Sequence, residues 1–388
     1  MRNVCVVVGS RANYGSIKAV MRAVKARSDL KLQLIVGASA VLDRFGSVVD
    51  LIERDGFVPD ARVNIIIEGE TPATMAKSTG LALLELPTLF DLLKPDVVVS
   101  VGDRFETMAT AIAAAYMNIP VAHTMGGEIS GTIDESIRHA VTKLAHLHFP
   151  ANQGAADRII RMGEDPGTVH VVGCPRMDLV AEIVARADGD GDGQWLDKEG
   201  VGAHVDPRQP FLLVSQHPVT TEYGDGERQI TETLLALVDL DLPAIVLWPN
   251  VDAGSDDVAR GIRKFREKHR EKHSPEHIRF VKNFPVETFV GLMKRAACLV
   301  GNSSAHVREG AFLGTPAVNI GSRQQGRDRG ANLVDAGYDR AEIAAAVRRQ
   351  IAHGPYPPDH LYGDGGAGPR IAELLARAPL KVQKRIVY

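Results

Sequence analysis

Residues 97–106 read VVVSVGDRFE, and this stretch decides the fold. Val97–Val101 is short, apolar and rich in valine, which is typical of a strand buried on both faces of a parallel sheet. A glycine and an aspartate follow, and an amphipathic segment, Phe105–Met117, begins directly after them. A buried strand that turns straight into a helix indicates a doubly wound α/β fold.

The same alternation continues on both sides of this stretch. In the first half of the chain, strands are predicted at Val4–Val8, Leu32–Val36, Val121–His123 and Val169–Val172, with a helix at Ser16–Arg27. In the second half, strands are predicted at Phe211–Ser215, Ala244–Trp248, Ile278–Val281, Cys298–Val300 and Ala317–Ile320, and helices lie between them. The pattern therefore predicts two Rossmann-like sheets, whose ligands bind at the carboxyl ends of the strands and would share a central cleft.

A length of 388 residues also favours two domains, because it exceeds what one hydrophobic core usually organises. The segment 187–209 is rich in Asp and Gly and contains Pro207, and we interpret it as a linker. We predict a first domain over 1–186, joined by a C-terminal helix at about 370–388, and a second domain over 210–369.

Charge and composition exclude several classes of partner. The formal net charge is -3, whereas a nucleic-acid-binding protein needs a concentrated basic surface. No apolar run approaches the roughly 20 residues that span a bilayer, and the N-terminal run is too short for a signal peptide. The cysteines, Cys5, Cys174 and Cys298, share no metal or redox spacing. We therefore expect a cytoplasmic protein with no membrane or nucleic-acid partner.

Polar clusters follow the predicted strands of the first domain. The run GSRANYG, residues 9–15, offers backbone N–H groups and Arg11 to an anion, although an ordinary turn at the start of a helix would have the same sequence pattern. Asp103 ends a valine-rich strand, where a carboxylate must face a cleft, find a partner or cap the next helix. A denser polar run extends from His123 through Glu128 to Asp134 and His139, which a capped helix start alone would not explain.

Matching clusters follow the strands of the second domain. Gly301-Asn302-Ser303-Ser304 precedes a helix that carries Glu309, and small hydroxyl residues at a helix N-terminus suit a diphosphate. Glu309 could accept hydrogen bonds from ribose hydroxyls. Alternatively, a serine of this run could be an ordinary N-cap and Glu309 a glutamate favoured by the helix dipole. His217 and Asn250 follow two further strands, and such a histidine suits acid catalysis or phosphate binding.

Taken in order, these segments resemble the hydrolysing UDP-N-acetylglucosamine 2-epimerases. The resemblance rests on the runs GDRFE, GGEISGTIDESIRHAVTKLAH, QHPVTTE, PNVDAGS, GNSSAHVRE…GTPAVN and GSRQQGR. It implies a glycosyltransferase-B type fold, a UDP-sugar substrate bound mainly by the second domain, and assembly into dimers or tetramers. It also implies a reaction through 2-acetamidoglucal that gives N-acetylmannosamine and UDP, with no cofactor, metal or nicotinamide.

The resemblance also implies roles for individual residues. Asp103 and Asp134 match two catalytic carboxylates of the family. His217 is a further candidate for catalysis or nucleotide contact. The other nucleotide and substrate contacts implied are Arg11, Arg104, Asn250, Ser303, Ser304, Glu309 and Arg323.

One position departs from the family pattern. The family reads His-x-Glu-Gly-Gly-Glu, where the first Glu is a third catalytic carboxylate, and this chain has Met125 there. A thioether cannot transfer a proton, so either Glu128 or another acid takes the role, or the outcome of the reaction differs. A nucleotide-retaining epimerase, a glycal-releasing enzyme, a glycosyltransferase of the same fold and a non-catalytic nucleotide-sugar binder remain alternatives. The Arg-Pro-Glu and Gly-Asp-Thr runs of the non-hydrolysing enzymes are absent, which disfavours the first.

Two further patterns are given less weight. Asp188-Gly-Asp190-Gly-Asp192-Gly193 with Glu199 fits a calcium loop, but glycines at once follow it, so we favour an acidic linker. His139 and His146 share a helix face, yet nothing nearby completes a metal-ligand set. We therefore expect no metal site.

Overall fold

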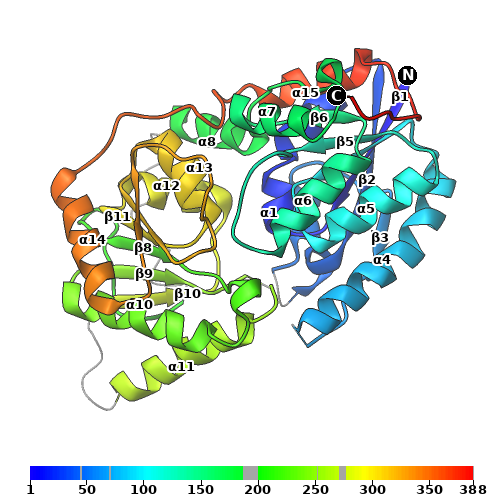
Figure 1. The fold of residues 1–388 in the computed structure, drawn as a ribbon. Helices are drawn as coiled ribbons and strands as arrows, with labels where there is room; N and C mark the ends of the chain where they lie inside the picture. The colour runs from blue at the N-terminus through cyan, green and yellow to red at the C-terminus, as the bar shows by residue number, and fades with distance from the viewer. Residues whose placement is uncertain (44–45, 70, 187–199, 251, 271–276, 388) are drawn as a thin grey trace. The chain divides into compact units, whose positions relative to one another are not determined.

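The computed structural model describes residues 1–43, 46–69, 71–186, 200–250, 252–270 and 277–387 (Figure 1). The chain forms two compact units. Unit 1 comprises Met1–Glu128, Ile133–Ala181 and Tyr362–Tyr388, and unit 2 comprises Ile129–Thr132 and Glu182–Leu361. The calcium-like pattern at 188–199 lies outside the described residues. Within the described ranges, no helix combines the length and apolar character needed to cross a bilayer.

Unit 1 is built on a six-stranded parallel sheet of order β3-β2-β1-β4-β5-β6. Its strands are β1 (Arg2–Val8), β2 (Leu30–Gly37), β3 (Ala61–Val63), β4 (Val97–Val101), β5 (Val121–Thr124) and β6 (Leu147–Phe149). Its helices are α1 (Arg11–Gly15), α2 (Lys18–Lys25), α3 (Val48–Arg54), α4 (Pro72–Leu93), α5 (Phe105–Tyr116), α6 (Ile133–Leu144), α7 (Gln153–Arg161), α8 (Pro175–Ala185) and α15 (Ala367–Arg377). Helices α4, α5 and α6 share one hydrophobic core with β1, β2 and β4.

Unit 2 repeats the same order around a second sheet, β13-β12-β11-β8-β9-β10-β7, in which only the edge strand β7 is antiparallel. Its strands are β7 (Val201–Gly202), β8 (Leu212–Ser215), β9 (Ala244–Leu247), β10 (Ile278–Val281), β11 (Cys298–Gly301), β12 (Ala317–Ile320) and β13 (Leu333–Ala336). Its helices are α10 (Gly226–Leu240), α11 (Ser255–Arg270), α12 (Val286–Arg295), α13 (Ser304–Leu313) and α14 (Arg340–His353). The prediction of two Rossmann-like sheets is therefore confirmed.

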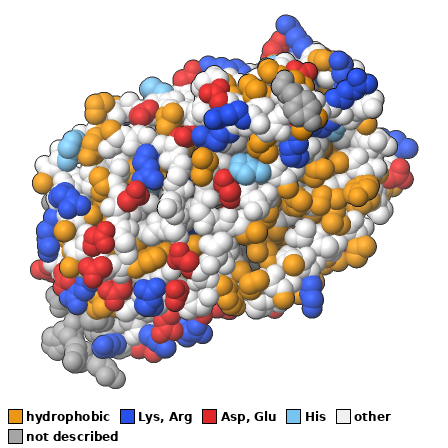
Figure 2. All heavy atoms as spheres, in the orientation of Figure 1, with side chains coloured by type: hydrophobic (Ala, Val, Ile, Leu, Met, Phe, Trp, Pro, Cys, Tyr) orange, Lys and Arg blue, Asp and Glu red, His pale blue; other side chains and the backbone are white. Residues whose placement is uncertain are grey.

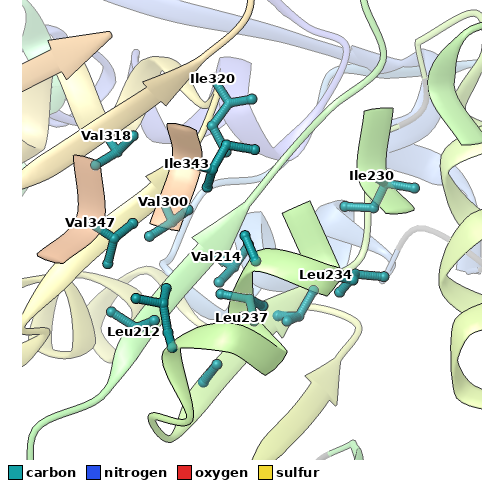
Figure 3. Close-up of a cluster of buried hydrophobic side chains, with 14 of the residues drawn as sticks. Leu212, Val214, Ile230, Leu234, Leu237, Val300, Val318, Ile320, Ile343 and Val347 are labelled. Atoms are coloured by element: carbon teal, nitrogen blue, oxygen red, sulfur yellow. The ribbon is translucent and has the colours of Figure 1, made fainter. Parts of the chain in front are cut away.

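The core of unit 2 shows why these short apolar runs become strands (Figure 3). Leu212 and Val214 on β8, Val300 on β11 and Val318 on β12 alternate toward one face of the sheet. Leucines of α10 and branched residues of α14 cover that face. Strands buried on both faces need no polar alternation, which is why the sequence shows them as continuous apolar runs.

One predicted strand is wrong. Val169–Val172 has the β-branched composition of a strand, but Val169 forms only a single bridge to His148 and the run is otherwise irregular. His170 donates its backbone N–H to the His148 carbonyl, and Val172 donates to Pro150. The segment therefore follows the edge of β6 without extending the sheet.

The C-terminal segment returns to unit 1. The carboxylate of Asp178 accepts the backbone N–H groups of Ala367 (2.9 Å) and Gly368 (2.7 Å) at the start of α15, where a helix dipole favours negative charge. Helix α15 then packs on α2. Beyond it, Lys384 donates to backbone carbonyls at the end of α6 and pairs with the buried Glu164 at 2.6 Å.

Glu164 has three cationic or hydrogen-bonding neighbours. Burial alone would raise its pKa, but hydrogen bonds from His148 (3.1 Å), Lys143 (2.6 Å) and Lys384 (2.6 Å) lower the pKa to about 2. A carboxyl whose pKa falls below its ordinary 4.5 stabilises the fold above that value, and this stability is lost as the pH falls toward 2.

We therefore predict that Glu164→Gln lowers the free energy of unfolding by about 2 kcal/mol at pH 7, the usual size for hydrogen bonds to a buried charge. Urea unfolding at pH 7, 5 and 3 measures the difference from the unsubstituted protein. The difference in unfolding free energy should have its full value at pH 7 and be clearly smaller at pH 3. Glu85→Gln, on the exposed face of α4, is the control, and a difference that grows toward pH 3 would contradict the assignment.

Candidate functional site

The strand orders place a switch point in each unit. In unit 1 the order reverses between β1 and β4, and in unit 2 between β8 and β11. Open α/β sheets bind ligands outside the carboxyl ends of the strands at such points, because the loops there diverge. The predicted site residues follow these same strands: Arg11 follows β1, Asp103 follows β4, His217 follows β8 and Ser303 follows β11.

The loops after β1 and β4 are joined by a buried hydrogen-bond network. The Asn13 side chain donates to the Val101 carbonyl (2.9 Å) and accepts the Gly9 N–H (3.3 Å). A Cβ at Gly9 would lie 2.4 Å from Cγ of Glu106, so only glycine allows this close approach. Glu106 in turn accepts a hydrogen bond from Arg104 at 3.1 Å.

Arg11 lies in the first turn of α1, whose N-cap is Ser10. The Ser10 hydroxyl accepts the Asn13 N–H (3.2 Å), which is the ordinary helix-start turn. Burial, and then the charge of Arg54, lower the pKa of the Arg11 guanidinium. Arg11 and Arg54 are neighbouring cations, and the Arg11 guanidinium is partly buried, so the pair forms a suitable site for an anion.

Asp103 is held by a buried arginine. Arg138, from α6, is 1% exposed and donates to Asp103 from Nη2 and, at 3.0 Å, from Nε. The N-cap residue of α5 is Arg104, not Asp103. The Asp103 carboxylate is 27% exposed, so it combines a fixed position with access to solvent.

The same guanidinium organises the start of α6. Arg138 also donates to Glu135 (2.7 Å) and to the Glu128 backbone carbonyl (2.9 Å), and Glu135 contacts His139 at 2.8 Å. Asp134, half-buried in the first turn of α6, neighbours this cluster in sequence. The structure therefore gathers Asp103, Glu135 and the Glu128 carbonyl on one cation, and sequence reasoning assigned no role to Arg138 or Glu135.

A signal for this cluster was present in the sequence. Glu135, Arg138 and His139 have the i, i+3 and i, i+4 spacing of neighbours on one helix face. The partnership with Asp103 had no such signal, because 35 residues separate it from Arg138.

The loop after β5 contains the departure from the family pattern. Met125 is buried, with φ of 60°, and its sulfur lies 3.4 Å from Sγ of Cys174. His123 precedes it and is fully buried, and its Nε2 lies 2.8 Å from the Gly102 carbonyl. Burial lowers the pKa of His123 to about 4, so the ring is neutral at pH 7 and donates to that carbonyl. Glu128, the alternative acid, is 1% exposed.

In unit 2, Asn302 ties the loop after β8 to the loop after β11. It is fully buried, accepts the His217 N–H at Oδ1 (2.7 Å) and donates from Nδ2 to the His217 carbonyl (2.9 Å). Gly301 precedes it with φ of 125°, and a Cβ there would lie 2.3 Å from the Ser215 carbonyl oxygen. Sequence reasoning quoted Asn302 within a motif but gave it no role.

The same asparagine anchors a third loop. Its backbone carbonyl accepts hydrogen bonds from Gln324 (2.9 Å) and Arg323 (3.3 Å). Arg323 lies 3.5 Å from Asp252, which also accepts a hydrogen bond from Asn250. Nδ1 of His217 accepts the Asn250 N–H at 3.2 Å, which leaves Nε2 to carry the proton. The structure therefore brings His217, Asn250 and Arg323 together around Asn302.

Ser303 and Ser304 open α13 beside this cluster. Ser303 is the N-cap and accepts the Ala305 N–H (3.3 Å), which confirms the N-cap, but Glu309 lies beyond the first turn of α13, so the helix-dipole role suggested for it is wrong. Ser304 accepts a hydrogen bond from Arg308 at 3.0 Å, and the next residue, Glu309, is buried. A helix start with small hydroxyl residues, and with Arg308 and Arg323 nearby, can hold an anionic group. Among the residues that the structure describes, no cluster of side chains suited to a metal ion occurs.

Comparison with known proteins gives one family. Residues 22–376 match the family described as UDP-N-acetylglucosamine 2-epimerase. The UDP-N,N'-diacetylbacillosamine 2-epimerase (hydrolyzing) of Legionella pneumophila is 32% identical over 383 residues, which cover 99% of this chain and 98% of the relative. The UDP-N-acetylglucosamine 2-epimerase of Neisseria meningitidis serogroup B is 29% identical over 395 residues, covering 100% and 99%.

Solved structures agree on the fold. The crystal structure of the UDP-GlcNAc 2-epimerase from Neisseria meningitidis bound to UDP-GlcNAc aligns with a TM-score of 0.80 at 16% identity, covering 96% of this chain and 99% of that one. With the family match spanning most of the chain, this protein belongs to the UDP-N-acetylglucosamine 2-epimerase family.

Proposed function

We propose that this protein is a hydrolysing 2-epimerase that converts UDP-N-acetylglucosamine and water into N-acetylmannosamine and UDP. The observation that carries the proposal is Asp103, which stands at the switch point of unit 1, is partly open to solvent and is fixed by the buried Arg138. Such a carboxylate suits proton transfer, because a catalytic base must be both positioned and accessible.

The proposed reaction has two steps. In the first, a carboxylate removes the proton at C2 while the C1–O bond to UDP breaks, so a C1–C2 double bond forms and 2-acetamidoglucal results. In the second, water adds at C1 and a proton returns to C2 from the opposite face, which inverts that centre. Two acid/base groups on different sides of the ring are needed, and we assign them to Asp103 and Asp134.

The leaving diphosphate needs stabilisation that grows as its charge develops. We assign this role to Ser303, Ser304 and Arg323, with Arg11 and Arg104 as further cationic contacts and Glu309 on the ribose. His217 and Asn250 share the Asn302 network, which suits a contact to the nucleotide or protonation of the leaving group. Glu128 is the proposed substitute for the carboxylate that Met125 lacks.

The identity of the sugar has two candidates. The Legionella relative, at 32% identity, is named for UDP-N,N'-diacetylbacillosamine, and the Neisseria relative, at 29%, for UDP-N-acetylglucosamine. Both are UDP-activated sugars with an acetamido group at C2, so the same chemistry serves either. A mixture of both substrates in one reaction gives the ratio of kcat/KM values and so decides between them.

The reaction itself is tested by following each UDP-sugar in D2O by proton and phosphorus NMR. Free UDP together with a manno-configured amino sugar deuterated at C2 is the expected result. A deuterated UDP-sugar without release of UDP would show a nucleotide-retaining epimerase, and accumulation of free glycal would show a lyase. Binding of both substrates without turnover would refute an enzymatic role.

Asn302 provides a test of the nucleotide site. Replacing it with alanine leaves the His217 N–H and carbonyl without their buried partners, which costs about 1–3 kcal/mol, and releases the loops of unit 2 from one another. We expect the Kd of UDP, measured by isothermal titration calorimetry, to rise about tenfold or more. Gln209→Ala is the control, because Gln209 is exposed before the amino end of β8; an unchanged Kd in Asn302→Ala would contradict the assignment.

We also propose that the protein is a homo-oligomer, a dimer or tetramer, as the family resemblance implies.

A further inference from the structure

The Arg323 guanidinium is enclosed by unit 2 but incompletely hydrogen-bonded. Its side chain is 12% exposed, and its Nη atoms lie 3.3 Å from the Asn302 carbonyl and 3.5 Å from Asp252. Its Nε is buried, and no residue in the described ranges accepts a hydrogen bond from it. An arginine has five N–H donors, and a buried donor without an acceptor is costly. This guanidinium therefore suits a ligand that supplies acceptor oxygens, as a diphosphate does.

The surface of unit 2 carries both signs of charge. On the face drawn in Figure 2, Lys and Arg side chains over α10, α11 and α14 are interspersed with Asp and Glu side chains. Ion pairs such as Arg260–Glu227 and Arg340–Asp239 join these helices. Mixed charges of this kind attract an anion only weakly, so binding of a diphosphate by unit 2 depends on individual arginines whose position is fixed.

A carboxylate holds the residue that precedes Arg323. Glu222 ends the QHPVTTE run, and its Oε1 accepts a hydrogen bond from the Ser322 hydroxyl. Its Oε2 accepts hydrogen bonds from the Tyr338 hydroxyl at 2.9 Å and from Nε2 of Gln229 at 2.6 Å. Both oxygens of this half-buried carboxylate are therefore engaged, and one of them acts on the loop that carries Arg323.

Tyr338 holds the start of the same loop. Its ring lies against Gly321, which has a φ of 73°, and a Cβ on that glycine would overlap the ring. Burial, and then the hydrogen bond to Glu222, raise the pKa of the Tyr338 hydroxyl above its ordinary value. The phenol is therefore protonated at neutral pH and donates to Glu222. We call Glu222, Ser322 and Tyr338 the Glu222 clamp.

The loop is anchored independently on the other side of Arg323. Gln324 is 2% exposed, and its Nε2 donates to the Asn302 carbonyl at 2.9 Å. Its Oε1 accepts a hydrogen bond from Arg327 at 2.7 Å. Arg323 therefore lies between two residues whose side chains are fixed, Ser322 by the Glu222 clamp and Gln324 by Asn302.

We propose that Glu222 and Tyr338 are positioning residues that hold Arg323 in place to bind the diphosphate of the nucleotide sugar. A loop that is fixed before the ligand arrives loses little conformational freedom on binding, which increases affinity. The inference rests on the proposed function, in which Arg323 contacts the diphosphate. It adds that the strength of this contact depends on two side chains that do not touch the nucleotide themselves.

Tyr338→Phe is the mildest test, because it removes one hydroxyl and keeps the ring against Gly321. We expect the Kd of UDP, measured with the full chain by isothermal titration calorimetry, to rise about fivefold, as for the loss of one hydrogen bond to a charged group. Glu222→Ala removes the acceptor of three donors and should raise this Kd about 20-fold. Glu222→Gln keeps one acceptor oxygen and should give an intermediate Kd.

Uridine separates positioning of Arg323 from a general loosening of unit 2. It lacks the phosphates, so its Kd, measured by ligand-observed NMR, should stay within about twofold in Tyr338→Phe and Glu222→Ala. Tyr356→Phe is the matched control, because it removes a hydroxyl that donates to Gln350 at 2.7 Å elsewhere in unit 2. It should leave the Kd of both ligands unchanged. An equal loss of affinity for UDP and uridine in Tyr338→Phe would overturn the positioning role.

Combining Tyr338→Phe with Arg323→Ala carries the decisive result. If the clamp acts through Arg323, adding Tyr338→Phe to Arg323→Ala should change the Kd of UDP by less than about twofold. The same fivefold rise in both backgrounds would overturn the positioning role. A Kd of UDP that rises in Arg323→Ala but not in Tyr338→Phe or Glu222→Ala would refute the clamp alone. An unchanged Kd in Arg323→Ala would refute the proposed diphosphate contact, and the clamp with it.

Discussion

Asp103→Asn should reduce kcat by about three orders of magnitude, within the range by which a positioned acid or base accelerates a reaction. The substitution keeps the shape of the side chain and one oxygen for Arg138, while it removes the ability to accept a proton. UDP should still bind, since most of the proposed nucleotide contacts, Ser303, Ser304, Glu309 and Arg323 among them, lie in unit 2. The measurement is the rate of UDP release from the UDP-sugar, together with the Kd of UDP.

The matching change Asp134→Asn separates the two proton transfers. The variant that lacks the base for C2 should neither release UDP nor exchange the C2 proton with D2O. The variant that lacks the acid for the second step should release UDP and accumulate 2-acetamidoglucal. Proton NMR in D2O distinguishes these outcomes, and Asp96→Asn, exposed just before the amino end of β4, is the control. Rates within threefold of the unsubstituted protein in both variants would refute the assignment of these carboxylates.

The sheets of both units could be predicted from sequence, because buried parallel strands leave continuous apolar runs. Val4–Val8, Val97–Val101 and Cys298–Val300 lie within β1, β4 and β11. Several elements of unit 1 were not predicted, among them β3 and α4. Strand β3 has only three residues, and α4 carries apolar residues on two opposite faces, which removes the one-sided periodicity that indicates a surface helix.

The positions of the candidate site residues could be predicted, but not their partners. The strand ends locate Asp103, His217 and Ser303, because ligand-binding loops follow strands in this fold. The partners come from distant segments: Arg138 lies 35 residues after Asp103, and Asn302 lies 85 residues after His217. Such pairs depend on how loops fold back on each other, which no local pattern in a single sequence records.

Arg138 is the residue whose loss should damage unit 1 most. Its side chain is 1% exposed and donates hydrogen bonds to Asp103, Glu135 and the Glu128 carbonyl. Arg138→Met keeps the length of the side chain but removes the cation that Asp103 and Glu135 share. A hydrogen bond to a charged group contributes about 1.5–3 kcal/mol, and because Asp103 and Glu135 are 27% and 29% exposed, we expect a loss of unfolding free energy of about 3 kcal/mol. Urea unfolding measures it, with the exposed Arg161→Met on α7 as the control.

Arg138→Lys should recover only part of this stability, because one ammonium cannot donate in the forked geometry that serves Asp103 and Glu135 at once. Adding Glu135→Gln to Arg138→Met removes one of the two carboxylates that lost this shared cation. The double variant should therefore be more stable than the sum of the single effects predicts, with a coupling of about 1 kcal/mol or more. Additive effects would show that the two side chains act independently.

A purely structural role for Arg138 differs from a positioning role in its effect on the pH dependence of turnover. A carboxylate that loses a neighbouring cation becomes easier to protonate. A catalytic base next to Arg138 would therefore become protonated, and turnover would fall, at a higher pH in the variant. We therefore expect the acid limb of the kcat/KM profile to move to higher pH in Arg138→Met, and by less in Arg138→Lys, which keeps a cation near Asp103. A lower kcat with an unmoved acid limb would show that Arg138 supports the fold of α6 without acting on the Asp103 carboxylate.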